Sequence, residues 1–284
     1  MPARVHPVWL VLAGIGSVQF GAALAKSLFD EASPTTIVWL RLATSAVLFA
    51  VVARPAVRGR TREDWLVVVG LGLALATMNW SIYQSFARIP LGLAVTLEFV
   101  GPLALAVAGS RRPRDLLWVL LAAVGVALLG LRGGDLNLAG VLFALAGGAA
   151  WAGYILLSAE TGRRWAGLGG LSIASLVAVA VMTPILLAGT PGDLGAWHLL
   201  AIGAAVGLLS SVIPYACELT ALRSLAPAVV SILLSLEPAA AALAGLLLLG
   251  EVLSAVQWLA ILCVVVASVG ATRSGRALAG VTNE

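Results

Sequence analysis

Four charged residues lie within long apolar runs of this chain, namely Lys26, Arg41, Glu98 and Glu237. A charge near the centre of a membrane-spanning helix costs about 2.5–3.5 kcal/mol on insertion scales, so such residues usually have partners and often mark a substrate or ion path. Two of the four are positive and two are negative. They could also form two ion pairs that only hold helices together, which is the alternative interpretation.

Prolines follow both carboxylates closely. Pro102 lacks the N–H that would bond the carbonyl of Glu98, four residues back, and Pro238 leaves the carbonyl of Leu234 free in the same way. Freed carbonyls at membrane depth are tolerated where they line a cavity or meet polar neighbours. We therefore expect helix breaks at Pro102 and Pro238, and a third at Pro214.

Other polar and aromatic residues in the apolar runs could line the same cavity. For each of them, helix packing explains the residue about as well as ligand contact. The candidates are Asn79, Trp80, Tyr83, Tyr215 and Glu218.

Signatures of enzymes and metal sites are missing from the sequence. His6 and His198 lie at the borders of apolar runs, Cys217 and Cys263 have no metal-ligand spacing, and no HExxH, GxSxG or P-loop pattern occurs. We expect no catalytic residue, no bound metal and no cofactor. ATP hydrolysis within this chain is excluded as a source of energy.

The composition is that of a membrane protein. Of the 284 residues, 61% are hydrophobic and 11% are charged, whereas soluble proteins carry about 25% charged residues. The mean hydropathy is +1.05. The net charge of +4 would otherwise suggest nucleic-acid binding, but in a membrane chain it usually marks cytoplasmic loops. We therefore expect the protein to lie in a lipid bilayer and not to bind nucleic acid.

Apolar runs of about 20 residues, long enough to cross the bilayer as helices, predict an all-α integral membrane protein with ten transmembrane helices. We place them at 8–28, 34–53, 65–87, 91–109, 115–131, 138–158, 168–188, 197–220, 226–249 and 254–272. The loops are too short for a soluble domain. The first run imitates a secretory signal peptide, with Ala23 to Ala25 as the cleavage site, but it is longer than a signal core.

At 1.5 Å per residue, Arg41 and Glu98 both lie about 10 Å below the outer surface and could pair.

Basic residues fall mostly on one side of these spans. The other side receives only Arg88 and Arg132, and the positive-inside rule therefore predicts that both termini are cytoplasmic. The thirteen on the cytoplasmic side are Arg4, Arg54, Arg58, Arg60, Arg62, Arg111, Arg112, Arg114, Arg163, Arg164, Arg223, Arg273 and Arg276.

Two segments of the chain echo each other. Residues 87–104 and 222–240 share a small-residue run followed by a proline, and Trp118 and Trp258 recur at the starts of the fifth and tenth spans. We expect two units of five helices, at 1–133 and 134–284. Since five is odd, the second unit is inverted, as in transporters that bind substrate between repeats. A relic of duplication without a transport role is the alternative.

The spans and motifs together resemble the EamA type of the drug/metabolite transporter superfamily over nearly the whole chain. The residues that carry the resemblance are 17–26, 39–42, 78–102, 151–154, 214–218, 236–238 and 249–251. Residues 25–29, 97–99 and 237–238 are similar to the threonine/homoserine exporter subgroup within it.

The resemblance implies proton-coupled export of small amino acids or related metabolites across the bacterial inner membrane. In that case Glu98 or Glu237 could bind the ammonium of a zwitterion, and Arg41 or Lys26 its carboxylate. Glu237, at mid-depth, is the better candidate for carrying protons. Export of another metabolite or toxic compound, and a structural membrane protein without cargo, are the alternatives. The oligomeric state is not predicted.

Overall fold

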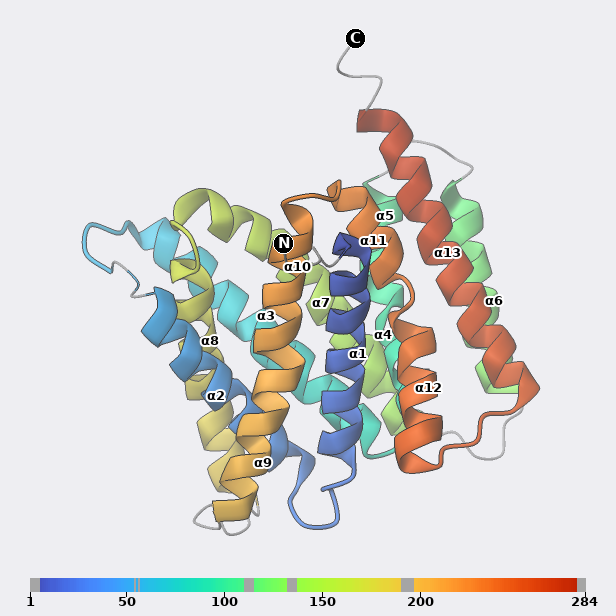
Figure 1. Cartoon of the computed structure of the whole chain (residues 1–284), viewed down its shortest axis with the longest axis horizontal. Coiled ribbons are helices and arrows are strands. Elements are labelled where there is room, and N and C mark those ends of the chain that lie inside the picture. The colour runs from blue at the N-terminus through green and yellow to red at the C-terminus, as the bar shows by residue number, and fades with distance from the viewer. Residues whose placement is uncertain are drawn as a thin grey trace.

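The computed structural model describes residues 6–53, 55, 57–109, 115–131, 137–189 and 197–279, and every regular element in these ranges is a helix (Figure 1). This is the backbone that a bilayer demands, because a lipid-exposed segment must bond its own N–H and C=O groups. Some basic residues assigned above to the two faces lie outside the described residues. They are Arg4, Arg54, Arg111, Arg112, Arg114 and Arg132.

Nine helical segments within the described ranges are long and apolar enough to cross a membrane. They are α1 (Pro7–Lys26), α2 (Pro34–Ala53), α3 (Arg62–Phe86), α4 with α5 (Leu91–Glu98 and Val100–Ala108), α7 (Leu138–Arg164), α8 (Gly169–Ala188), α9 with η2 and α10 (Trp197–Gly207, Leu208–Val212 and Ile213–Leu222), α11 with α12 (Pro227–Leu234 and Glu237–Leu249), and α13 (Ala255–Ala279). The predicted span 115–131 holds α6 (Leu116–Leu131), which is apolar but only 16 residues long.

Local sequence explains where several helices start and stop. At the start of α3, the Thr61 hydroxyl accepts from the Asp64 N–H and the Asp64 carboxylate accepts from the Thr61 N–H, which is a capping box. Asn137 caps α7 through its side-chain oxygen. At the end of α12, Gly250 has a φ of 68°, a left-handed conformation that glycine adopts without strain.

Two of the membrane segments are interrupted at corresponding places. The first half-helix α4 ends at Glu98 and α11 ends at Leu234, in each case four residues before a proline, Pro102 or Pro238. The prolines then lie in the first turns of α5 and α12, where a helix needs no donor from them. Both interruptions therefore follow from one missing N–H each.

Small residues let the interrupted helices approach their neighbours. Gly101 of α5 faces Gly148 of α7 so closely that a Cβ on either residue would collide with backbone atoms of the other segment. Gly92 of α4 packs in the same way on Ala242 of α12. Close backbone contact of this kind is a usual basis of helix association in membranes.

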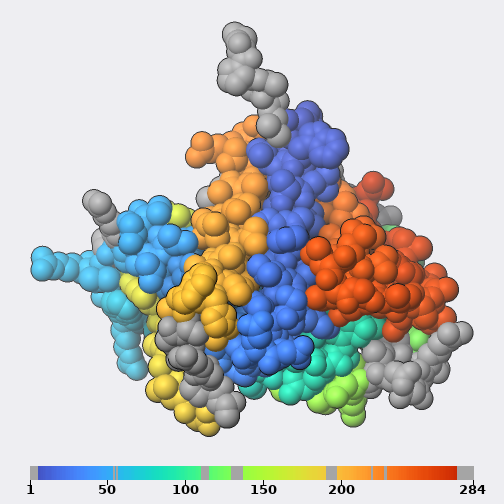
Figure 2. Space-filling model, turned by 60° about the horizontal axis from the view of Figure 1, so that its bottom comes forward, coloured from blue at the N-terminus to red at the C-terminus, as the bar shows by residue number. Residues whose placement is uncertain are grey.

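The helix contacts follow a pattern that repeats along the chain. α3 packs along α7 and α8, while α10 packs along α1 and α9 along α2. α6 and α13 lie side by side at one edge of the bundle (Figure 1). α1 lies between α10 on one side and α12 on the other. In Figure 2 it reaches the surface as a blue strip between the orange and the red-orange segments. A common centre is thus surrounded by α1, α2, α3, α4, α7, α8, η2, α10 and α12.

Candidate functional site

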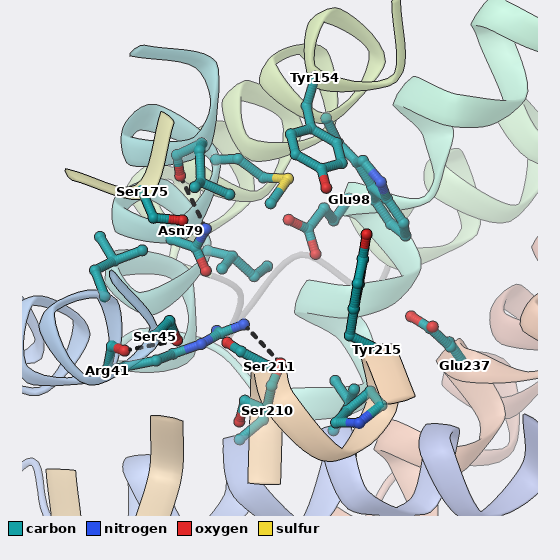
Figure 3. Close-up of a pocket in the computed structure, with 18 of the residues that line it drawn as sticks. Arg41, Ser45, Asn79, Glu98, Tyr154, Ser175, Ser210, Ser211, Tyr215 and Glu237 are labelled. Atoms are coloured by element: carbon teal, nitrogen blue, oxygen red, sulfur yellow. Dashed lines mark hydrogen bonds between the residues drawn. The ribbon is translucent and has the colours of Figure 1, made fainter. Parts of the chain in front are cut away.

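A cavity of about 290 Å³ lies at this centre, lined by residues from both halves of the chain (Figure 3). The first half contributes from α1, α2, α3 and α4, and the second from α7, α8, η2, α10 and α12. Ligand pockets in proteins run from about 300 to 1,000 Å³, so this cavity suits a small ligand. Its polar lining residues are Gln19, Arg41, Ser45, Asn79, Glu98, Tyr154, Ser175, Ser210, Ser211, Tyr215, Glu218 and Glu237.

Arg41 of α2 reaches across the cavity to the second half of the chain. Its Nη2 donates to the carbonyl of Ser210 at 3.1 Å, and its guanidinium lies 5.6 Å from the centre of the Tyr83 ring. Its buried Nε has no hydrogen-bond partner. Among the ion pairs of the described residues, none involves Arg41, so the pairing with Glu98 considered from the sequence is not formed.

Pro214 explains why the carbonyl of Ser210 is available. The segment η2 is a turn of π-helix, in which Ile213 donates to Leu208, five residues back. Because Pro214 has no N–H, it can bond neither Ser210, the α-type partner, nor Leu209, the π-type partner. Instead, the Arg41 guanidinium donates to the carbonyl of Ser210, and the Ser17 hydroxyl of α1 donates to the carbonyl of Leu209 at 2.7 Å. The break therefore anchors α1 and α2 to η2.

Glu98 is the last residue of α4, and its side chain projects into the cavity (Figure 3). It is 9% exposed, and none of the ion pairs found among the described residues includes its carboxylate. Glycines of α7 make room for it, since a Cβ at Gly147 would lie 3.3 Å from Oε1 and a Cβ at Gly148 would collide with the Glu98 carbonyl. The carboxylate is thus placed in the cavity without a cation of its own.

Four polar residues of the first half share one level of the bundle. Each lies seven residues from the same-side end of its helix, about 10 Å along the axis. They are Gln19 before Lys26, Arg41 after Pro34, Asn79 before Phe86 and Glu98 after Leu91. Asn79 donates its Nδ2 to the carbonyl of Leu75 at 2.8 Å, which leaves its Oδ1 facing the cavity (Figure 3).

The second half contributes aromatic rings and two further carboxylates. Tyr215 of α10 stands between Glu98 and Glu237, and Tyr154 of α7 lies above Glu98 in Figure 3. Tyr215 packs edge-on against Phe49 of α2, with ring centroids 5.8 Å apart. Glu218 and Glu237 both line the cavity. In the described part of the chain, no three His, Cys, Asp or Glu side chains gather as a metal site.

The two ends of the cavity differ. At one end the last residue that lines the cavity is Phe86. Phe86 is 3% exposed and packs on the fully buried Tyr83, with ring centroids 5.6 Å apart. At the other end Phe49, Leu171 and Glu218 are partly exposed. The cavity is therefore closed on the side where α1 ends and α2 begins.

Some residues expected in the site lie elsewhere. Lys26 pairs with Glu251 at 2.6 Å and donates to the carbonyl of Ile89 at 2.7 Å, outside the cavity. Trp80 donates its Nε1 to Thr35 at 3.1 Å. Tyr83 is buried behind Arg41, and neither Pro102 nor Pro238 lines the cavity.

The cavity also contains residues that the sequence reasoning did not select. Of the uncharged polar residues in the lining, that reasoning selected Asn79 and Tyr215. It missed the others, and it also missed the Trp151 ring that packs on Phe99. Gln19 could have been found as an amide in an otherwise apolar helix. The missed lining residues with polar groups are Gln19, Ser45, Trp151, Tyr154, Ser175, Ser210 and Ser211.

Membrane-length helices around a central polar cavity are typical of membrane transport proteins. A model of the EamA-like transporter family matches residues 138–273. The threonine/homoserine exporter RhtA of Salmonella typhimurium (strain SL1344) is 39% identical over 276 residues, covering 95% of this chain and 93% of its own. RhtA of Escherichia coli (strain K12) is 38% identical over 280 residues, 96% and 95% of the two chains.

The chain therefore belongs to the EamA-like transporter family, within the drug/metabolite transporter superfamily, and to its RhtA-like members. A more distant relative, the uncharacterized transporter YwfM of Bacillus subtilis (strain 168), is 31% identical over 162 residues, covering 53% of this chain and 52% of its own. A crystal structure of a protein 20% identical to this chain matches with a TM-score of 0.64, covering 95% of this chain and 98% of that one. At that identity the likeness shows the shared fold alone. The family is one of transporters and not of enzymes.

Proposed function

We propose that this protein exports threonine, homoserine or similar small amino acids from the cytoplasm of a bacterium. The RhtA relatives, which are named as threonine/homoserine exporters, support this substrate class. The observation that carries the proposal is the presence of Arg41 and Glu98 in one cavity without an ion pair between them. A cation and a carboxylate that face the same space without pairing with each other are complementary to a zwitterion.

The substrate's carboxylate binds to Arg41 and its ammonium to Glu98. Arg41 has donors to spare, because hydrogen bonds to Tyr83 and Ser210 occupy only two of its five N–H groups. Charge-assisted bonds to a carboxylate are roughly twice as strong as neutral ones. Asn79 Oδ1 offers the ammonium a second acceptor beside Glu98. These assignments leave Lys26 out, because its ammonium is already bound to Glu251.

The chain spans the membrane ten times, with α6 as the fifth span and both termini in the cytoplasm. The basic residues of the loops support this orientation, as the positive-inside rule requires. Two inverted five-helix halves, 1–133 and 134–284, account for the repeated contacts, since exchanging the halves turns α3 on α7 into α10 on α1. The structure is then closed to the outside and the cavity faces the cytoplasm.

Protons drive the export, and Glu237 carries them. This carboxylate begins α12 at the second helix interruption and lines the cavity in which we place the substrate. An ionisable residue at membrane depth that faces a cavity is the usual proton carrier in pumps and transporters.

Inside-out membrane vesicles test the proposal, because the cytoplasmic face is then outside and export appears as uptake. Vesicles that contain the protein should accumulate labelled threonine and homoserine above the level of vesicles without it. Cells that overproduce the protein should also grow at higher concentrations of these amino acids. The proposal fails if no amino acid in a panel accumulates or protects. Protection against unrelated toxic compounds alone would instead favour another cargo on the same fold.

A further inference from the structure

Gln19 of α1 is a buried amide without a partner. Its side chain lines the cavity, the residue is 2% exposed, and no described residue bonds its Oε1. Buried side-chain polar atoms are nearly always hydrogen-bonded, and leaving one unpaired is unfavourable, so an exception calls for an explanation. A ligand in the cavity that hydrogen-bonds the amide is such an explanation.

The other unpartnered polar atoms of the cavity have different roles. The Arg41 Nε is a cationic donor and suits an anion. The Ser210 hydroxyl faces α1, where a Cβ on Gly21 would collide with it, so it lies in a helix contact. The hydroxyls of Ser45 and Ser175 are bonded to carbonyls of their own helices, at 2.9 Å in both cases. Among the buried polar atoms of the lining that lack a hydrogen-bond partner in the described residues, the Gln19 Oε1 is therefore the one that remains for an uncharged group of a ligand.

We propose that Gln19 binds the side-chain hydroxyl of the substrate and makes the transporter selective for hydroxylated amino acids. This inference rests on the proposed function. With the carboxylate at Arg41 and the ammonium at Glu98, the hydroxyl is the remaining polar group of threonine or homoserine. Gln19 lies at the same level as both charged residues. An amide offers both a donor and an acceptor, as a hydroxyl does, and rotation about the last side-chain bond turns either toward the cavity.

Selectivity follows from the unpaired amide. A substrate without the hydroxyl fills the same space but leaves Gln19 buried and unbonded, which disfavours its binding. Sites built to hydrogen-bond a hydroxyl reject analogues that lack it far more strongly than apolar pockets reject a change of size.

The experiment compares threonine and homoserine with 2-aminobutyrate, the compound that both become when the hydroxyl is replaced by hydrogen. Transport rates in inside-out vesicles give kcat/KM for each substrate, and their ratio does not depend on how much of a variant is folded. The wild type should prefer the hydroxylated substrates. Gln19→Met, close in shape, should lower this preference by roughly tenfold or more, and Gln19→Asn, which keeps an amide, should lower it less.

Ser175→Ala is the matched control, since the Ser175 hydroxyl also lines the cavity but is bonded to its own helix. Its preference should equal that of the wild type. An unchanged ratio in Gln19→Met, or a wild type without preference for the hydroxyl, overturns the inference while amino-acid export stands. A wild type that moves neither threonine nor 2-aminobutyrate overturns the proposed function with it.

Discussion

The Lys26 ammonium and the Glu251 carboxylate lie 2.6 Å apart and join the end of α1 to the turn between α12 and α13. The other oxygen of Glu251 accepts from the N–H of Leu91 at 2.8 Å, at the start of α4, where the helix dipole favours a negative charge. Figure 2 shows the turns around these residues side by side on one face of the molecule. The ion pair therefore holds three helices together on the closed side of the cavity.

Transport should require this contact to open. If Lys26 and Glu251 are both replaced by Cys, linking the two thiols with a short bifunctional methanethiosulfonate should reduce threonine transport to background, and a reductant, which cleaves the link, should restore it. Single-Cys variants treated alike control for the native Cys217 and Cys263. Full transport by the demonstrably cross-linked protein would show that this side does not open.

Gly148→Ala should destabilise the protein, because the added Cβ meets the Glu98 carbonyl and the backbone of Gly101. Overpacking of this kind typically costs about 1–3 kcal/mol, which a thermal unfolding measurement in detergent detects as a lower Tm. Gly153→Ala, on the same helix with open space around the new Cβ, is the control and should keep its Tm. Equal melting of the two variants would contradict the contact.

Pro214→Ala should weaken substrate binding more than folding. The new N–H can bond the carbonyl of Leu209 or Ser210 and so competes with Ser17 or Arg41. With Arg41 less well held, we expect KM for threonine to rise by up to about tenfold, the worth of one hydrogen bond, while the Tm stays the same or increases. An unchanged KM would mean that the Arg41 contact does not position the guanidinium.

Glu237→Gln should uncouple transport from the proton gradient. The amide keeps the shape of the side chain but cannot take up or release a proton. In vesicles, the variant should equilibrate threonine without accumulating it, and an imposed pH gradient should no longer change the rate. Glu218→Gln, another carboxylate of the cavity, is the comparison. Wild-type dependence on the gradient in Glu237→Gln would remove this residue from the proton path.

The parts of this structure that follow from local chemistry could be predicted from the sequence. The interruptions after Glu98 and Leu234 result from prolines four residues later, and the membrane-length helices follow from apolar runs. The partner of Lys26 could not be predicted, because Glu251 is distant in sequence and reaches it through the fold. The sequence also does not tell which side of each helix faces the cavity. For this reason Gln19, Tyr154 and Ser211 were missed, while Trp80 was chosen.

Affinity for incomplete substrates tests the central claim most directly, namely that Arg41 and Glu98 bind opposite ends of a zwitterion. Calorimetry on the purified protein should show binding of threonine but much weaker binding of threoninol, which lacks the carboxylate, and of 3-hydroxybutyrate, which lacks the ammonium. Arg41→Met and Glu98→Gln should each lower the affinity for threonine by about thirtyfold or more. Arg41→Met should also abolish the discrimination against threoninol. Equal binding of threonine and both analogues, or wild-type affinity in both variants, would contradict the account.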